Sequence, residues 1–223
     1  MTLWNEKQLP ALKKSLSHVL WIGGATDAGK TTTAALLAEK YKVQVYHGDQ
    51  HWRENWSNIT PKNQPAMTLW DKMSMDERWL HRSVESLTQQ TLQIMTERFP
   101  FIVDDLLAIP QETSVVAEWF GFMPEYIAPL LSQPGQALWI FPDEKFKKMS
   151  TDKRGKHNFH QDTSNPENAW QNHLQRDLTL AAQSQHQAAA RGLKIIINDA
   201  IKTRENILEE VESHFAVFLS ETP

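Results

Sequence analysis

The sequence predicts an α/β protein: a three-layer α/β/α fold with a five-stranded parallel sheet. Five short apolar runs alternate with segments of helical periodicity, which is typical of a parallel sheet with helices on both faces. The 223 residues are enough for one sizeable domain, and the sequence has no internal repeat or second domain boundary. We therefore expect residues 1–223 to form a single domain.

The expected elements follow one another in order. Leucines at spacings of three and four predict a short helix over residues 5–15, and Met75–Phe99 has helical spacing throughout. Gly192 is placed to end a helix over 165–191, and Thr203 can cap the last helix. The strands are expected over residues 18–24, 43–49, 114–119, 137–142 and 193–199, and two further helices over residues 30–41 and 203–219. On the helix over 165–191, one side carries Trp170, Leu174, Leu178, Ala182 and Gln185.

The choice of the third strand is ambiguous, because "FIVDD" and "VVAEW" each resemble a strand that ends in a carboxylate. About a dozen residues separate them, which is the shortest crossover that parallel neighbours allow, and Pro110 interrupts the gap. We therefore expect only residues 114–119 to form a strand. Ile102, Leu106 and Leu107 are then expected on a short helix before it.

Composition excludes several classes of function. The 23 basic and 27 acidic residues give a mildly acidic chain, without the footprint of a protein that binds nucleic acid or an anionic membrane. The absence of cysteine rules out disulfides, thiolate metal sites and a cysteine nucleophile. The chain has no signal pattern at its N-terminus and no apolar run of about 18 residues. We expect a cytoplasmic protein, monomeric or homodimeric, without a membrane or nucleic-acid partner.

The stretch "GGATDAGKTT" is the strongest functional signal. Gly24 to Thr31 satisfies G-x-x-x-x-G-K-[ST], between an apolar strand and a helix. Gly24 and Gly29 permit the backbone angles that turn successive N–H groups around a phosphate, and Lys30 supplies a charge at the start of the helix. The Thr31 hydroxyl can bind Mg²⁺. The expected nucleotide-binding residues are Gly24, Ala25, Thr26, Asp27, Ala28, Gly29, Lys30, Thr31 and Thr32.

With this loop near the N-terminus, a carboxylate after the second strand and a basic segment after the fourth, the chain resembles the small-molecule kinases of the P-loop NTPase superfamily. That group includes the shikimate, gluconate, nucleoside and nucleotide kinases and chloramphenicol phosphotransferase. The segments "YHGDQHW", "VVAEWFGFMPE" and "ALWIFPDEKF" are similar to a set of bacterial P-loop kinase-like proteins. The resemblance implies ATP, Mg²⁺ and transfer of the γ-phosphate to a hydroxyl of a small molecule, such as a nucleoside, sugar acid or antibiotic.

Two carboxylates are candidates for the chemistry. Asp49 follows the second strand, where similar kinases place an aspartate that binds the acceptor or takes its proton, so we expect it to be catalytic, with Lys30. Glu118, near the end of the third strand, resembles the Walker B position, where the family usually has Asp. We expect it either to bind the waters of the metal that Thr31 holds or to contact the substrate, and the departure from Asp leaves its division of labour with Asp49 open. Asp104 and Asp105 compete for that role if "FIVDD" is a strand.

A basic segment at about 143–166 is expected to be a lid. It contains Lys145, Lys147, Lys148, Lys153, Arg154 and Lys156. Arg154 and Arg176 are the expected catalytic cations, because a guanidinium matches phosphate oxygens well. Residues 198–200 are expected near the nucleotide base. Trp52 and Trp56 either wall the acceptor pocket or anchor their loop, and Trp119 can add to the same wall.

Two rival functions stay open. A nucleotide switch would hydrolyse slowly and signal to a protein partner, but neither a water-positioning residue nor an effector loop is identifiable. A nucleic-acid end kinase is disfavoured by the net charge, although the lid is basic. A metal pair of His47 and His51 is disfavoured because the strand and Gly48 argue against a helix there.

Overall fold

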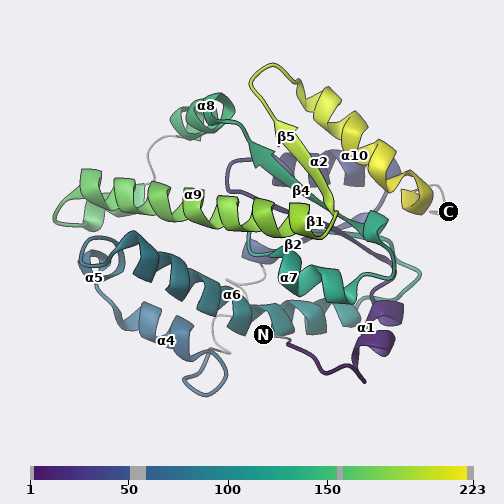
Figure 1. Cartoon of the computed structure of the whole chain (residues 1–223), viewed down its shortest axis with the longest axis horizontal. Coiled ribbons are helices and arrows are strands. Elements are labelled where there is room, and N and C mark those ends of the chain that lie inside the picture. Colours follow the sequence, from purple (N-terminus) through teal and green to yellow (C-terminus); the bar gives the residue numbers. More distant parts are fainter. Residues whose placement is uncertain (1–2, 51–58, 155–157, 220–223) are drawn as a thin grey trace.

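The computed structural model has the predicted α/β architecture, with a five-stranded, all-parallel sheet flanked by helices (Figure 1). It describes residues 3–50, 59–154 and 158–219, without the side chains of 151–154, 158 and 159. The strand order is β2-β3-β1-β4-β5, so β1 lies at the centre of the sheet. The strands are β1 Val19–Gly24, β2 Gln44–His47, β3 Val115–Glu118, β4 Ala137–Pro142 and β5 Lys194–Asn198. All five predicted strands are confirmed.

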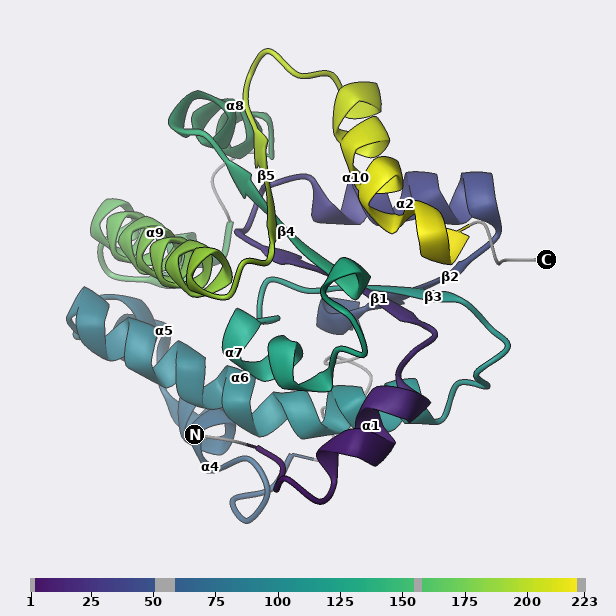
Figure 2. The ribbon, with the colours of Figure 1, turned by 45° about the vertical axis from the view of Figure 1, so that its right-hand side comes forward.

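Helices cover both faces of the sheet. Figure 2 shows α2 and α10 together on one face, and α6, α7 and α9 with α1 on the other. The helices are α1 Leu9–Ser15, α2 Lys30–Tyr41, α4 Pro65–Lys72, α5 Met75–Trp79, α6 Val84–Leu107, α7 Pro124–Ile127, α8 Glu144–Arg154, α9 Pro166–Ala190 and α10 Arg204–Leu219. Short 3₁₀ turns are η2 Ala128–Leu130, η3 Pro134–Gln136 and η4 Asn158–Asp162. Within the described residues, no helix is long and apolar enough to span a membrane.

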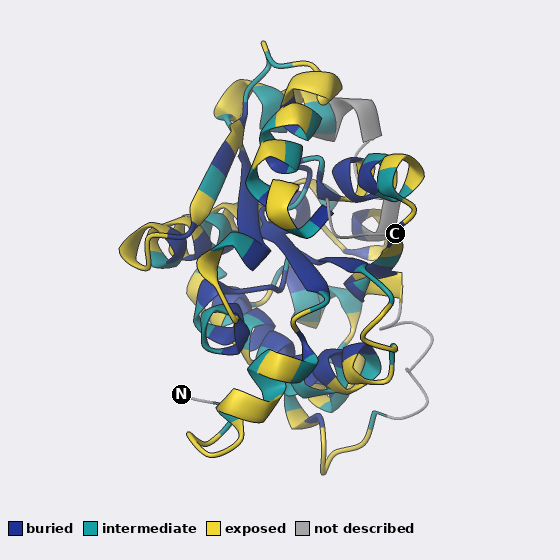
Figure 3. Cartoon of the chain, turned by 90° about the vertical axis from the view of Figure 1, so that its right-hand side faces the viewer, coloured by how far each residue is buried: buried dark blue, intermediate teal, exposed yellow. Residues whose placement is uncertain are grey.

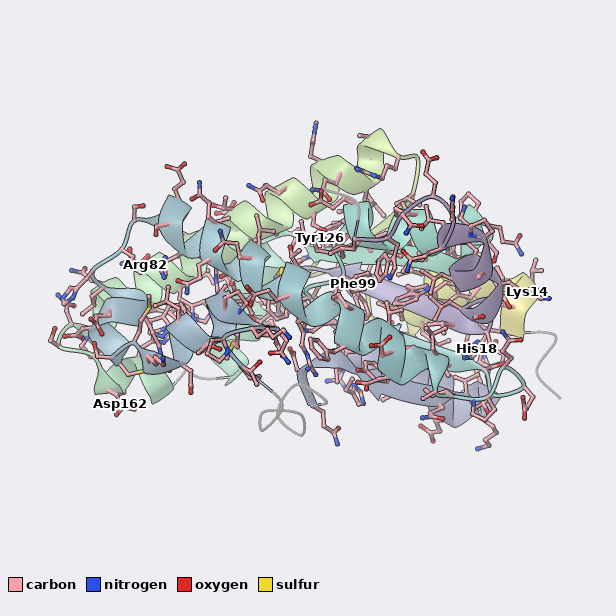
Figure 4. All side chains as sticks on the ribbon, turned by 90° about the horizontal axis from the view of Figure 1, so that it is seen from below. Lys14, His18, Arg82, Phe99, Tyr126 and Asp162 are labelled. Carbon is pink, nitrogen blue, oxygen red and sulfur yellow. The ribbon has the colours of Figure 1, made fainter. Side chains whose placement is uncertain are left out.

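The core lies along the central strands, which are dark blue in Figure 3 while the outer sides of the helices are exposed. Trp21 of β1 is fully buried and contacts Phe99 and Phe122, with ring centroids 6.4 and 5.2 Å away. Phe99 and Tyr126, both labelled in Figure 4, have centroids 5.6 Å apart. Each such buried ring contributes roughly 1.5–3 kcal/mol, so this cluster fixes α6 and α7 against the sheet.

The helical spacing over 75–99 is divided between two helices rather than one. Ser74 and Glu77 form a capping box that begins α5, and Ser83 caps α6 by accepting a hydrogen bond from the Ser86 N–H. The predicted short helix over 102–107 is the last part of α6, which continues through Pro100. The cost of an internal proline, about 3 kcal/mol, is offset because the turns after it bury Ile102, Val103 and Leu106.

Helix α9 turns its polar residues inward. Its buried side chains include His173, Arg176, Asp177 and Ser184. An apolar stripe usually faces the core, yet on α9 Leu178 is 44 % exposed and Ala182 is also exposed. Of the predicted stripe, only Trp170 is buried. The long-range partners of the polar residues therefore decide how α9 is rotated.

The segment expected to be a lid is largely helical. Asp143 caps α8, accepting a hydrogen bond from the Phe146 N–H at 2.6 Å, and η4 follows before α9 begins. Figures 1 and 2 show α8 beyond the ends of β4 and β5. The described part of the segment thus places the start of α8 next to the carboxyl edge of the sheet.

Replacing Gly24 by alanine is expected to destabilise the protein far more than the same change at Gly192. Both glycines have positive φ, +115° and +62°, but a Cβ on Gly24 would lie 2.0 Å from the Ile140 carbonyl oxygen, whereas nothing lies within 4 Å at Gly192. Gly192→Ala should cost about 1–2 kcal/mol in unfolding free energy. Gly24→Ala should cost about 3 kcal/mol or more, since overpacking adds to the backbone strain. Equal losses in urea denaturation would contradict the close approach.

Candidate phosphate-binding site

The loop between β1 and α2 has the backbone of a phosphate cradle. Gly24, Asp27 and Gly29 all have positive φ, at +115°, +59° and +94°. Such changes of handedness turn successive N–H groups toward a common concavity. The loop is held from the sheet, because the Ala25 N–H donates to Ile140 O at 3.1 Å and Asn198 Nδ2 donates to Ala28 O at 2.9 Å. The predicted nucleotide-binding residues thus run from the end of β1 through this turn into the first residues of α2.

Lys30 and Thr31 begin α2 at the mouth of this turn. The Lys30 ammonium is buried and donates to Ala25 O at 2.6 Å. Burial lowers the pKa of Lys30, and the nearby carboxylates of Glu118 and Asp49 partly oppose that effect. Thr31 is exposed, and its hydroxyl donates to Glu118 Oε1 at 3.2 Å. An anion in the turn would therefore meet a buried cation and the positive end of a helix.

Glu118 is the carboxylate that lies beside this helix start. It ends β3, in register with His47 of β2, and His47 Nδ1 lies 2.8 Å from Glu118 Oε1. The competing acids lie elsewhere: Asp104 is exposed on α6, and Asp105 accepts a hydrogen bond from the Tyr46 hydroxyl at 2.7 Å. The structure thus brings Thr31 and Glu118 together, and their expected role at a metal stays a prediction.

Asp49 lies on the same edge of the sheet. Residues 48–50 are helical, and the Trp119 indole N–H donates to Asp49 Oδ1 at 2.9 Å. Trp119 is only 1 % exposed, so it holds Asp49 from within the core and offers almost no surface as a wall of an acceptor pocket. A Cβ on Gly48 would lie 2.6 Å from the Trp119 ring, which explains why glycine stands there. His51, Trp52 and Trp56 lie outside the described residues.

From the basic segment, Lys147 reaches the loop. Its ammonium on α8 donates to Thr26 Oγ1 at 2.7 Å, to Thr26 O at 3.2 Å and to Asp27 Oδ2 at 2.9 Å. The sequence favours arginine at this place, but the side chain of Arg154 lies outside what is described. Lys147 belongs to the predicted basic run, and only the fold could single it out, because Thr26 is 121 residues away.

Arg176 is buried on α9 and does not contact the loop itself. It pairs with Asp177 at 2.8 Å between Nη2 and Oδ1, donates to Thr91 Oγ1 at 3.2 Å and lies 5.2 Å from the Trp79 ring. Asp177 is the residue that reaches the loop, since Thr26 Oγ1 donates to its Oδ2 at 2.8 Å. These contacts favour a role for Arg176 in positioning Asp177, rather than the predicted direct contact of Arg176 with phosphate. No local signal in the sequence indicates Asp177.

Opposing effects act on Asp177. Burial raises its pKa, but the Arg176 guanidinium and His173, whose Nε2 lies 3.3 Å from Oδ2, outweigh burial and hold the pKa well below its ordinary value. The carboxylate therefore stays ionised in the folded protein and accepts the Thr26 hydrogen bond.

A pocket of about 420 Å³ opens beside the loop. Gly29 and Thr32 form its loop side, Asn198 ends β5 on the second side, and Phe146 of α8 lies on the third. Asn198 was expected near the nucleotide base, and it does line this pocket. The size lies within the range of small-molecule sites.

The described residues supply few ligands for the metal that is predicted at Thr31 and Glu118. Within residues 3–50, 59–154 and 158–219, no three histidine, cysteine or acidic side chains gather as they would around a metal ion. One hydroxyl and one carboxylate suit Mg²⁺, which keeps several waters and shares its other ligands with phosphates.

A comparison of the chain with models of known protein families found no match. A comparison with curated proteins found none either. The function is therefore inferred from the chemistry of the site.

Asp177→Asn is expected to destabilise the fold by about 3–5 kcal/mol at pH 7, because it leaves the buried Arg176 without its counter-charge. The folded pKa of Asp177 is depressed, so its stabilisation is present above the unfolded pKa of about 3.9 and is lost as the pH falls through the folded value. The gap between the two proteins should therefore narrow below about pH 4. The matched control is Asp104→Asn at an exposed position, which should change stability by less than about 0.5 kcal/mol. A gap that is constant with pH in denaturation curves would contradict the ionised pair.

Proposed function

We propose that this chain is an ATP- and Mg²⁺-dependent kinase that transfers the γ-phosphate to a hydroxyl of a small molecule. The observation that supports this proposal is the set of contacts at the start of α2. A buried lysine closes a turn with three positive φ angles, and the next hydroxyl meets the carboxylate that ends the neighbouring strand. The turn with its lysine is what a bound phosphate needs, and the hydroxyl beside a carboxylate is what a phosphate-bound Mg²⁺ needs. The resemblance to small-molecule P-loop kinases agrees with both.

The proposed place of each part of the nucleotide follows from the neighbours of the loop. Residues 24–32 would hold the phosphates, with Lys30 at the terminal ones, and Thr31 and Glu118 would hold Mg²⁺ and its waters. The pocket of about 420 Å³ begins at Gly29 and Thr32, so the base and ribose would enter it beside Asn198 and Phe146. ATP supplies the phosphoryl group, and Mg²⁺ neutralises the charge on its oxygens.

Asp49 is the proposed catalytic base. It would accept the proton of the acceptor hydroxyl while that oxygen bonds to the γ-phosphorus and the bridging bond to the β-phosphate breaks, leaving ADP. The Trp119 N–H donates to one carboxylate oxygen of Asp49 and so fixes the carboxylate at the edge of the sheet where the phosphates would lie. Lys147 is the lid cation closest to the loop in the described chain, and we propose it beside Arg154 for the transferred charge, with Arg176 positioning the loop through Asp177.

The choice of acceptor lies with the residues around Asp49, and a nucleoside, a sugar acid and an antibiotic-like alcohol all fit the proposed reaction. A chain without cysteine suits the reducing cytoplasm, where we propose that it acts, alone or as a homodimer. Among the contacts of the described residues, none favours a nucleotide switch or a nucleic-acid end kinase.

Lys30→Ala is expected to weaken Mg·ATP binding by about 10- to 100-fold, since a hydrogen bond to a charged group contributes about 1.5–3 kcal/mol. Isothermal titration calorimetry would measure it. The matched control is Lys14→Ala, an exposed lysine on α1 before the amino end of β1, which should bind like the parent (Figure 4). Equal affinity of the parent and Lys30→Ala, or no binding by the parent, would refute the nucleotide site.

Asp49→Asn is expected to abolish phosphoryl transfer while leaving Mg·ATP affinity within about twofold, because the amide keeps its hydrogen bond to Trp119 but cannot take a proton. The measurement is ADP release in the presence of a panel of nucleosides, sugar acids and hydroxylated antibiotics. Acceptor-dependent turnover that survives in Asp49→Asn would show that another group is the base. Turnover stimulated only by a protein or by a nucleic-acid end would favour the rival functions.

A further inference from the structure

Helix α9 presents an apolar surface that no described element covers closely. Leu174, Leu178 and Ala182 lie on the outer side of α9, away from His173, Arg176 and Ser184, and with Ala181 they line a pocket of about 640 Å³. The far wall is the end of β4, at Phe141 and Pro142. Apolar side chains gathered around an open space of this size indicate a ligand rather than an ordinary surface.

This pocket is separate from the one assigned to the nucleotide base. The two lie on different sides of α8, because Phe146 and Met149 line the smaller pocket while Glu144 and Lys148 line the larger one. Lys147 also lines the larger pocket and is held by its bonds to Thr26 and Asp27. Each pocket thus has its own lining, although both reach the phosphate loop.

Closure of α8 onto α9 would not bury the apolar residues of α9 against apolar partners. The side of α8 that faces α9 carries Glu144, Lys147 and Lys148, and burying such charges against leucine and alanine is unfavourable without partners. The apolar residues of α8 point into the other pocket. The occupant therefore comes from outside the described chain.

The charges of the lining indicate what that occupant is. Two cations, Lys147 and Lys148, line the pocket together with two acids, Asp143 and Glu144, so this side of the rim carries balanced charge. Asp177, which also lines the pocket, is already paired with Arg176. An ionised ligand would have no excess of opposite charge to meet. A volume of about 640 Å³ suits a compact small molecule rather than a flat protein surface.

We propose that the space between α8 and α9 binds a neutral, largely apolar small molecule, with one end beside Ala25 and Thr26 of the phosphate loop. This site does not depend on the proposed kinase activity. Its own residues are apolar at the walls and charge-balanced at the rim, and they include neither Lys30 nor Asp49.

The test uses N-phenyl-1-naphthylamine, a neutral probe whose fluorescence rises in apolar surroundings. The parent protein is expected to bind one equivalent. Ala182→Trp should weaken that binding at least tenfold, because the indole fills the pocket from an exposed position. Its matched control is Ala189→Trp, an exposed alanine of the same helix outside the pocket, which should bind the probe like the parent.

A second variant guards against a folding defect in the first. Leu178→Asp places a charge on the apolar wall at a residue that is 44 % exposed, and it should also weaken the probe at least tenfold. The probe assay contains no nucleotide, so failure of the nucleotide site leaves this test intact. No binding by the parent, or equal binding by the parent, Ala182→Trp and Leu178→Asp, would overturn the proposal.

Discussion

The turn at the end of β1 constrains everything around it. β1 lies between β3 and β4, and Gly24 approaches Ile140 of β4 so closely that a side chain there would overlap the Ile140 backbone. The chain can leave the sheet only by the path that Gly24 and Gly29 allow. That path sets the first residue of α2. It hence places the Lys30 ammonium within hydrogen-bonding distance of Ala25 O, and the Thr31 hydroxyl within hydrogen-bonding distance of Glu118.

Thr26 joins this turn to the two helices above it. Its hydroxyl donates to Asp177 of α9 and accepts from Lys147 of α8, so one small side chain connects three segments. A buried ion pair such as Arg176–Asp177 is weak evidence for stability, because an apolar pair often serves as well. We interpret the role of the pair as positional, because it keeps the Asp177 carboxylate ionised where the Thr26 hydroxyl needs an acceptor.

The sequence was sufficient where short-range chemistry decides the structure. Five apolar runs, the glycines of the loop and the caps of the helices all act over a few residues, and the strands followed from them. Glu118, 87 residues from Thr31, was instead a candidate because of the family resemblance. Long-range pairing decides the rest. The periodicity of α9 indicates an apolar stripe, but Thr26, 151 residues away, bonds to Asp177 and turns the polar side inward. The same limit applies to Lys147, whose neighbours in the basic run look equally suited.

The two pockets meet at one loop, and this has a thermodynamic consequence. The smaller pocket touches the loop at Gly29 and Thr32, and the larger one touches it at Ala25 and Thr26. Between them stands Lys147, bound to both Thr26 and Asp27. If an occupant of the larger pocket shifted this lysine, it would change the charge that faces a ligand at the loop. Because coupling of binding free energies is reciprocal, that ligand would change the affinity of the larger pocket by the same factor.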